Sequence, residues 1–118
     1  MPPSTRQKST RATSLAAAMA AEAERAAELL KAMAHPQRLR VLCLLVEGER
    51  SVGEINEDIE LSQSALSQHL AKLREEGLVD TRKEAQTVFY RLAESPAVAV
   101  IRALHDAYCP TDTAKRRG

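Results

Sequence analysis

The chain has 118 residues, enough for one compact domain and too few for two ordinary ones. Its hydrophobic content of 44% allows a buried core, and an aromatic content of only 3%, with no Trp, favours helical packing over a β-sandwich or a barrel. The formal net charge is +1, with basic residues concentrated in residues 1–14 and 110–118 around a net acidic middle. Because basic ends are often only solubilising, this charge does not by itself predict a nucleic-acid partner.

The sequence contains no segment typical of a membrane protein. No apolar run approaches the roughly 18 residues of a membrane span. The Ala-rich residues 15–21 are followed at once by Glu22 and Glu24, unlike the end of a signal peptide. We therefore expect a cytoplasmic protein with no membrane contact, in which the two cysteines are reduced thiols rather than a structural disulfide.

Two helices are predicted in the first half of the chain. Ser14 can cap a helix of about 20 residues that ends at Ala34. Pro36 suits the first turn of a second helix, which Gly48 ends. This second helix is apolar on most sides, so we expect it to be the most buried one.

The next two predicted helices are separated by a tight turn. Ser51 and Glu54 fit a capping box that opens a short helix through Ile59. Ser62 can cap the following helix, which Gly77 ends. A short helix, a turn of a few residues and a second helix form a helix-turn-helix.

The hydrophobic period then changes from helix to strand. Residues 79–83 and 88–92 alternate in polarity, which predicts a two-stranded hairpin, the wing of a winged helix-turn-helix. Ser95 and Pro96 open a last helix that ends near Cys109. The predicted fold is therefore mainly α with a small β-hairpin, with about five helices and a two-stranded wing.

This fold divides the chain into one domain and two tails. We expect residues 15–109 to form one winged helix-turn-helix domain. Residues 1–14 are expected to be a disordered basic tail, since they are rich in Pro, Ser and Thr. Residues 110–118 are expected to be a second basic tail.

The segment 61–74 is the predicted recognition helix. Leu66, Leu70 and Leu73 form its inward stripe. Its outward face carries short polar side chains that can pair with base edges, and cations that suit phosphates: Gln63, Ser64, Ser67, Gln68, Lys72 and Arg74. His69 lies at the margin of the stripe, where it either packs under the helix or contacts a phosphate. An ordinary solvated helix is the alternative interpretation of this face.

The hairpin also offers groups for DNA. Its exposed parts carry Arg82, Lys83, Gln86 and Arg91, which suit the DNA backbone or the minor groove. A solvated hairpin is the alternative. Ala85 lies at the tip of the hairpin, and the turn type stays open.

The two cysteines lie on separate predicted helices. Cys43 falls on an apolar stripe and is most simply a small core residue, whereas Cys109 at a helix end is expected to be accessible. The helix dipole opposes a thiolate at Cys109, while His105 and Arg40, each one turn from a cysteine, favour one. The direction of the net effect stays open.

Several motifs together resemble the winged-helix repressors of the ArsR/SmtB family, over most of residues 25–109. Residues 34–42, AHPQRLRVL, match that family's entry to its second helix, and residues 61–70, LSQSALSQHL, match its recognition helix. Residues 77–79 and 90–92 match its wing. The resemblance implies a homodimer joined through its first and last helices, which binds operator DNA of inverted-repeat sequence. In the last helix it implies an interface at Val98, Ile101, Leu104 and Tyr108.

The usual effector of that family is a metal, but its ligands are missing here. The first helix of the helix-turn-helix, residues 52–57, contains no cysteine pair. In the last helix only His105 and Asp106 are present, adjacent and therefore on different faces. We expect no metal site, no cofactor and no enzymatic activity; a thiol oxidoreductase would need a Cys-x-x-Cys motif, which is absent.

With one cysteine in each of two helices and no metal site, the chain resembles the dithiol branch of the family, the BigR/SqrR type, which senses reactive sulfur and oxidants. This resemblance implies that Cys43 and Cys109 react with a sulfane-sulfur effector and become cross-linked by a disulfide or a longer sulfur bridge. The cross-link would release the operator. Peroxide-type oxidation, or a thiophilic metal bridged by both thiols, remains the alternative trigger.

Overall fold

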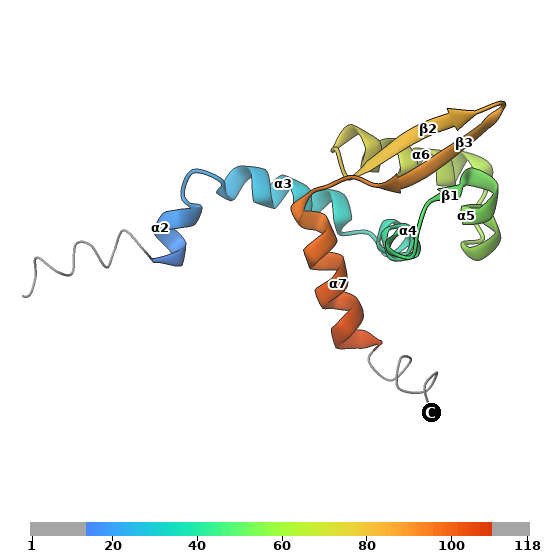
Figure 1. Cartoon of the computed structure of the whole chain (residues 1–118). Coiled ribbons are helices and arrows are strands. Elements are labelled where there is room, and N and C mark those ends of the chain that lie inside the picture. The colour runs from blue at the N-terminus through green and yellow to red at the C-terminus, as the bar shows by residue number, and fades with distance from the viewer. Residues whose placement is uncertain (1–13, 110–118) are drawn as a thin grey trace, which may run out of the picture.

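The structure is a computed structural model that describes residues 14–109 (Figure 1). The predicted tails, residues 1–14 and 110–118, lie outside the described residues except for Ser14. Six helices and three strands follow one another in the described part: α2 (Leu15–Met19), α3 (Ala23–Met33), α4 (Pro36–Val46), β1 (Arg50–Ser51), α5 (Val52–Asp58), α6 (Gln63–Glu75), β2 (Val79–Glu84), β3 (Thr87–Leu92) and α7 (Pro96–Tyr108).

The long first helix that we predicted is in fact two helices. The Ser14 side chain accepts a hydrogen bond from the Ala17 N–H at 3.1 Å, which confirms the predicted cap. The chain then turns after Met19, and α3 begins at Ala23. No residue of α2 is buried, so no tertiary packing supports a continuous helix there, and short exposed helices are marginal in water.

The second predicted helix, α4, is confirmed in its bounds and its burial. Pro36 occupies its first turn, and Gly48 follows its end with a φ of 147°, a conformation that side-chain-bearing residues rarely adopt. Val41, Leu42 and Leu45 are buried. Leu66, Leu70 and Leu73 of α6 belong to the same core, as their spacing predicts, together with Ile55 of α5 and Ile101 of α7.

The wing contains one strand more than we predicted. β2 and β3 pair antiparallel, and the two-residue strand β1 pairs with β3 on its other edge, giving the order β1-β3-β2. A strand this short shows no alternation in the sequence, so its pairing is visible only in the folded chain. At the tip, Ala85 has a φ of 56°.

The last helix, α7, begins and ends close to its predicted bounds. The Ser95 side chain caps it, and Cys109 is its C-cap residue. In Figure 1, α7 leads away from the layer that contains α6 and the wing. Ile101 is fully buried in the core of a single chain, which is a correction to its predicted place in a dimer interface. Within residues 14–109, no helix has the length and apolar character needed to cross a bilayer.

Candidate nucleic-acid interface and thiol pair

The helix-turn-helix is held by local hydrogen bonds that fix the start of α6. The predicted capping box is present, since Ser51 and Glu54 exchange hydrogen bonds of 3.1 and 2.8 Å. Ser62 caps α6 through the Ala65 N–H at 3.1 Å. Asn56 donates to the carbonyl oxygens of both Ile59 and Leu61, closing the turn between the two helices. We did not predict this role, although an Asn just before a turn is a recognisable signal.

The outward face of α6 is exposed, as its sequence predicts. The polar residues of this face are all exposed: Gln63, Ser64, Ser67, Gln68, Lys72 and Arg74. Within the described residues, the side chains of Gln63, Ser67 and Gln68 make no hydrogen bond to another part of the chain. Lys72 pairs with Glu76 at 3.5 Å. The face therefore keeps uncommitted donors and acceptors in a row along one helix.

His69 lies on the other side of this helix. Its ring packs against that of His35, with ring centroids 4.4 Å apart, and its Nδ1 is buried with no hydrogen-bond partner in the described structure. Burial, followed by the charges of His35 and Arg38, lowers the pKa of His69, so the ring is neutral at neutral pH. Of the two interpretations left open for His69, the structure favours packing under the helix.

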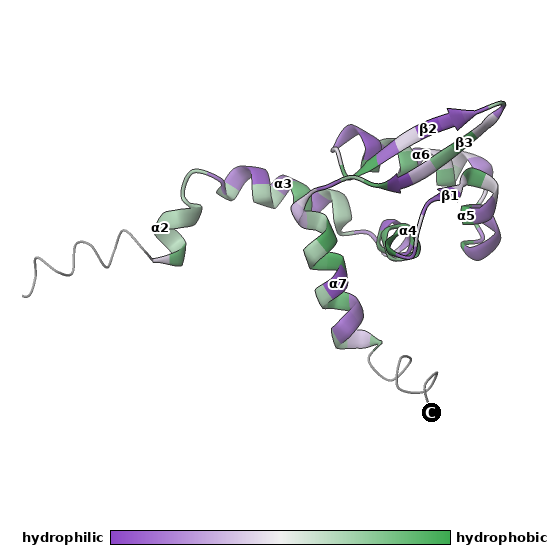
Figure 2. Cartoon of the chain, viewed as in Figure 1, coloured by the Kyte–Doolittle hydropathy of each residue, from purple (hydrophilic) through white to green (hydrophobic). Residues whose placement is uncertain are grey.

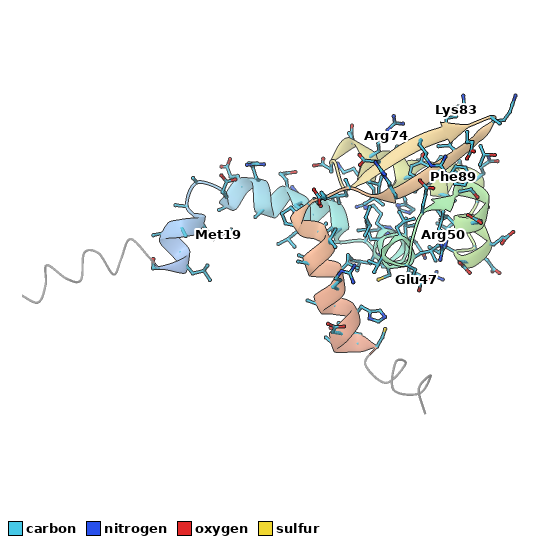
Figure 3. All side chains as sticks on the ribbon, in the orientation of Figure 1. Met19, Glu47, Arg50, Arg74, Lys83 and Phe89 are labelled. Carbon is cyan, nitrogen blue, oxygen red and sulfur yellow. The ribbon has the colours of Figure 1, made fainter. Side chains whose placement is uncertain are left out.

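The charged groups of the wing differ in how far they are already paired. Arg82 binds Glu49 through two hydrogen bonds of 2.8 Å and Glu84 through one of 2.9 Å. Arg91 lies 3.9 Å from Asp80. By contrast, Lys83 and Gln86 are exposed and make no side-chain hydrogen bond within the described residues; Figure 3 shows Lys83 on the outer part of the hairpin.

A hollow of about 480 Å³ joins α6 to the wing. Ser67, Arg74 and Tyr90 are among the residues that line it. In Figure 3, Arg74 and Lys83 lie on the same side of the molecule, opposite Glu47 at the end of α4. Arg74 of α6 and Lys83 of the wing, two of the predicted DNA-binding residues, therefore lie toward the same side of the molecule.

The two cysteines lie at α4 and at the end of α7, two helices that pack against each other. Both are half-buried and neither is in a disulfide. Burial raises the pKa of the Cys43 thiol, and the charges of Cys109 and Glu47 raise it further. Cys109 is thus close enough to Cys43 to affect its ionisation.

A hollow of about 340 Å³ opens beside Cys43. Cys43, Glu47 and Ile59 line it together with His105, which comes from α7 one turn before Cys109. The Cys109 N–H donates to the His105 carbonyl at 2.7 Å. Arg40, also at this hollow, donates hydrogen bonds to Gln37 and to the Asp58 carbonyl, so its guanidinium is engaged on the α5 side.

Metal ligands do not gather in the described part of the chain. Among residues 14–109, no three His, Cys, Asp or Glu side chains lie close enough to hold a metal ion. His105 and Asp106 are 3.8 Å apart, and both are exposed.

A third surface lies between α3 and α7. A groove of about 990 Å³ runs there, lined by charged residues and by apolar ones that include Leu29, Leu30 and Val100. Leu30 of α3 is 51% exposed, and Tyr108 of α7 is 81% exposed. Figure 2 shows hydrophobic colouring along much of α7.

Known proteins similar in sequence to this chain show which family it belongs to. The signature described as "Bacterial regulatory protein, arsR family" matches residues 35–81, from the start of α4 into β2. The transcriptional activator HlyU of Vibrio cholerae is 60% identical over 85 residues, which cover 72% of this chain and 79% of HlyU. The biofilm growth-associated repressor of Agrobacterium fabrum is 50% identical over 92 residues, covering 78% and 79%.

A solved structure shows the same fold. The transcriptional repressor BigR of Xylella fastidiosa superimposes with a TM-score of 0.72 at 46% identity, covering 77% of this chain and 93% of that one. These relatives are transcriptional regulators rather than enzymes. With its winged helix-turn-helix and relatives of this identity and coverage, the chain belongs to the ArsR family of bacterial regulatory proteins.

Proposed function

We propose that this regulator is a dimeric repressor that binds an inverted-repeat operator while its thiols are reduced. Reactive sulfur species release it by cross-linking Cys43 and Cys109. The observation that supports this switch is that α4 and α7 pack against each other beside Cys43. His105 of α7 lines the same hollow as Cys43, and the charge of Cys109 adds to the rise in the pKa of the Cys43 thiol. Two free thiols on two helices that pack against each other can be joined by sulfur.

The chemistry balances with a persulfide, R–S–S–H, as the oxidant. One cysteine thiolate attacks the terminal sulfur, the S–S bond breaks, and R–S⁻ leaves and takes up a proton, so the cysteine becomes a persulfide. The second cysteine thiolate attacks the cysteine sulfur of that persulfide and expels hydrosulfide, which forms the disulfide. Two thiols lose two electrons, and one sulfane sulfur is reduced to sulfide. If the cysteine persulfide first attacks the terminal sulfur of another R–S–S–H, R–S⁻ leaves again and the bridge formed on closure is one sulfur longer.

On the DNA side, α6 reads bases and the wing contacts the backbone. Gln63, Ser67 and Gln68 are the favoured reading residues, because they are exposed and have no partner within the described chain. Ser64 is exposed nearby, although its hydroxyl lies 3.4 Å from that of Ser62. Lys72, Arg74, Lys83 and Gln86 suit phosphates. The paired Arg82 and Arg91 and the packed His69 are less favoured contacts.

Binding measurements on operator and random DNA separate reading from positioning. Gln63→Ala and Ser67→Ala are expected to lose about 10- to 100-fold of the preference for operator DNA, since a good base contact discriminates by about 1–3 kcal/mol. Lys72→Gln is expected to weaken binding to both DNAs alike. Equal weakening of both DNAs by all three variants would contradict a reading role for α6.

Dimerisation through α3 and α7 accounts for the exposed apolar residues on these helices. Leu30 and Tyr108 would be covered by a second copy, which places two α6 helices in successive major grooves. A bridge between α4 and α7 would then move each α6 relative to the dimer interface and change their spacing. Light scattering on the full chain is expected to give twice the mass of one chain; a monomer at operator-binding concentrations would contradict this.

A mobility-shift assay with a persulfide donor tests the switch. The reduced wild-type protein is expected to bind the operator and to release it after treatment. Cys43→Ser and Cys109→Ser are expected to bind equally well when reduced and to stay bound after treatment. Undiminished release in either variant would contradict the cross-link and leave the DNA-binding function intact.

A further inference from the structure

Arg82 of the wing and Glu49 form a bidentate ion pair on the surface of the described part of the chain. The Arg82 Nε donates to Glu49 Oε2 and its Nη2 donates to Glu49 Oε1, both at 2.8 Å. Glu49 lies in the connection between α4 and β1, whereas Arg82 lies in β2 of the wing. A bidentate pair of this kind fixes direction as well as distance.

Two further contacts hold the same guanidinium. Its Nη1 donates to Glu84 at 2.9 Å, and its carbon lies 4.4 Å from the centre of the Phe89 ring. Phe89 is the cross-strand partner of Arg82 and also pairs with Ser51 of β1. The hydrogen bonds from Arg82 lower the pKa of Glu49, so the pair is ionised at neutral pH.

We propose that Glu49 is a positioning residue for DNA binding, which holds the wing against the end of α4 through Arg82. In this arrangement Arg82 orients the wing through its pair with Glu49 and does not contact DNA, and Lys83 and Gln86 contact the phosphates. The proposal rests on the proposed DNA binding but not on the thiol switch. Because Cys43 lies on α4, the Glu49–Arg82 pair would also transmit a movement of that helix to the wing.

The construction of the sheet explains why such a clamp is needed. β1 supports β3 over only two residue pairs, Arg50 with Tyr90 and Ser51 with Phe89. Beyond them the hairpin projects as two strands, and isolated two-stranded hairpins are marginally stable. The side chains of Arg82 and Glu49 are 48% and 29% exposed, so the pair contributes orientation more than stability.

The rival interpretation is that Glu49 masks an arginine that would otherwise bind phosphate. The two interpretations predict opposite results for Glu49→Gln. Loss of a clamp weakens DNA binding, whereas loss of a mask strengthens it. Arg82→Gln separates them again, because removal of a phosphate contact lowers the slope of log affinity against log salt by about 1, and removal of a clamp leaves the slope unchanged.

The experiment compares full-length reduced variants on an operator fragment over a series of salt concentrations. Glu49→Gln and Arg82→Gln are each expected to weaken binding about 3- to 10-fold, although they change the net charge in opposite directions. The double variant is expected to lose no more than either single one, because both remove one shared interaction. Glu49→Asp keeps the charge but shortens the reach, and is expected to weaken binding as well.

Glu84→Gln is the matched control, since it removes the same charge from the same guanidinium but leaves Glu49 in place. It is expected to change affinity less than twofold. Lys83→Gln provides the reference for a true phosphate contact and is expected to lower the salt slope by about 1. Tighter binding by Glu49→Gln, additive losses in the double variant, or a lower slope in Arg82→Gln would overturn the proposal.

A measurement without DNA keeps this inference separate from the proposed function. Hydrogen exchange of the backbone amides in residues 82–89 is expected to speed up in Glu49→Gln and Arg82→Gln, but not in Glu84→Gln. Unchanged exchange in both of the first two variants would overturn the clamp even if operator binding were confirmed. Failure of the wild-type protein to bind an operator would overturn the proposed function and leave the clamp standing.

Discussion

Cys43 lies within α4 at the edge of the core, whereas Cys109 caps the C-terminal end of α7. Burial raises the pKa of Cys43, and the charges of Cys109 and Glu47 add to the effect, so Cys43 holds less thiolate at neutral pH than an ordinary cysteine. Because a thiolate is the attacking species, this difference suggests an order of events. We expect Cys109 to take up sulfur first and Cys43 to close the bridge.

The largest effect expected from this asymmetry is in the first sulfur transfer. With a limiting amount of persulfide donor, Cys43→Ser is expected to gain one sulfur atom on Cys109 at about the wild-type rate. Cys109→Ser retains only Cys43, whose burial raises the pKa of its thiol, and is expected to react more slowly. Intact-mass spectrometry over time measures both rates. Equal rates in the two variants would contradict the proposal that Cys109 takes up sulfur before Cys43.

The helical positions of both thiols follow from local sequence signals. Pro36 and Gly48 bound the helix that carries Cys43, and Ser95 opens the helix that Cys109 ends. The same signals predict the helix-turn-helix and the exposed face of α6, because caps and hydrophobic spacing act over a few residues. These parts of the candidate sites could therefore be predicted from the sequence.

The contacts that need the folded chain could not be predicted. Arg82 looks in the sequence like a free cation for DNA, but its partner Glu49 lies 33 residues away. The burial of Cys43, which sets the direction of its pKa shift, and the added effect of Cys109 likewise depend on the folded chain, in which α7 packs on α4. The break after Met19 also depends on packing, since α2 has nothing to pack against in one chain. A local pattern carries no information on partners this distant in sequence.

The pH dependence of bridge closure tests whether the pKa of the Cys43 thiol is raised. Because the pKa of Cys43 is raised, its thiolate fraction at neutral pH lies well below one and rises about tenfold per pH unit until the pH reaches that pKa. We expect the rate of closure, measured after Cys109 has been loaded with sulfur, to keep rising past pH 9, beyond the ordinary pKa of a cysteine thiol. A closure rate that levels off at or below about pH 8.5 would show that the pKa of Cys43 is not raised.

A smaller effect is expected from the carboxylate one turn after Cys43. Glu47→Gln removes a charge that raises the pKa of Cys43, so closure at pH 7 is expected to become faster, by up to about twofold, as like charges four residues apart on a helix cost about 0.2–0.5 kcal/mol. Asp106→Asn on α7 is the control, an exposed carboxylate that is expected to leave the rate unchanged. A slower closure in Glu47→Gln would contradict the direction of the shift.

The central claim is that joining Cys43 to Cys109 by sulfur releases the operator. The most direct test is to treat the protein–operator complex with a persulfide donor, separate released from bound protein, and determine the intact mass and free-thiol content of each. Released chains are expected to have no free thiol and to carry an internal sulfur bridge, while bound chains are expected to keep both thiols. Released chains with two free thiols, or with oxygen or a metal in place of the bridge, would contradict it.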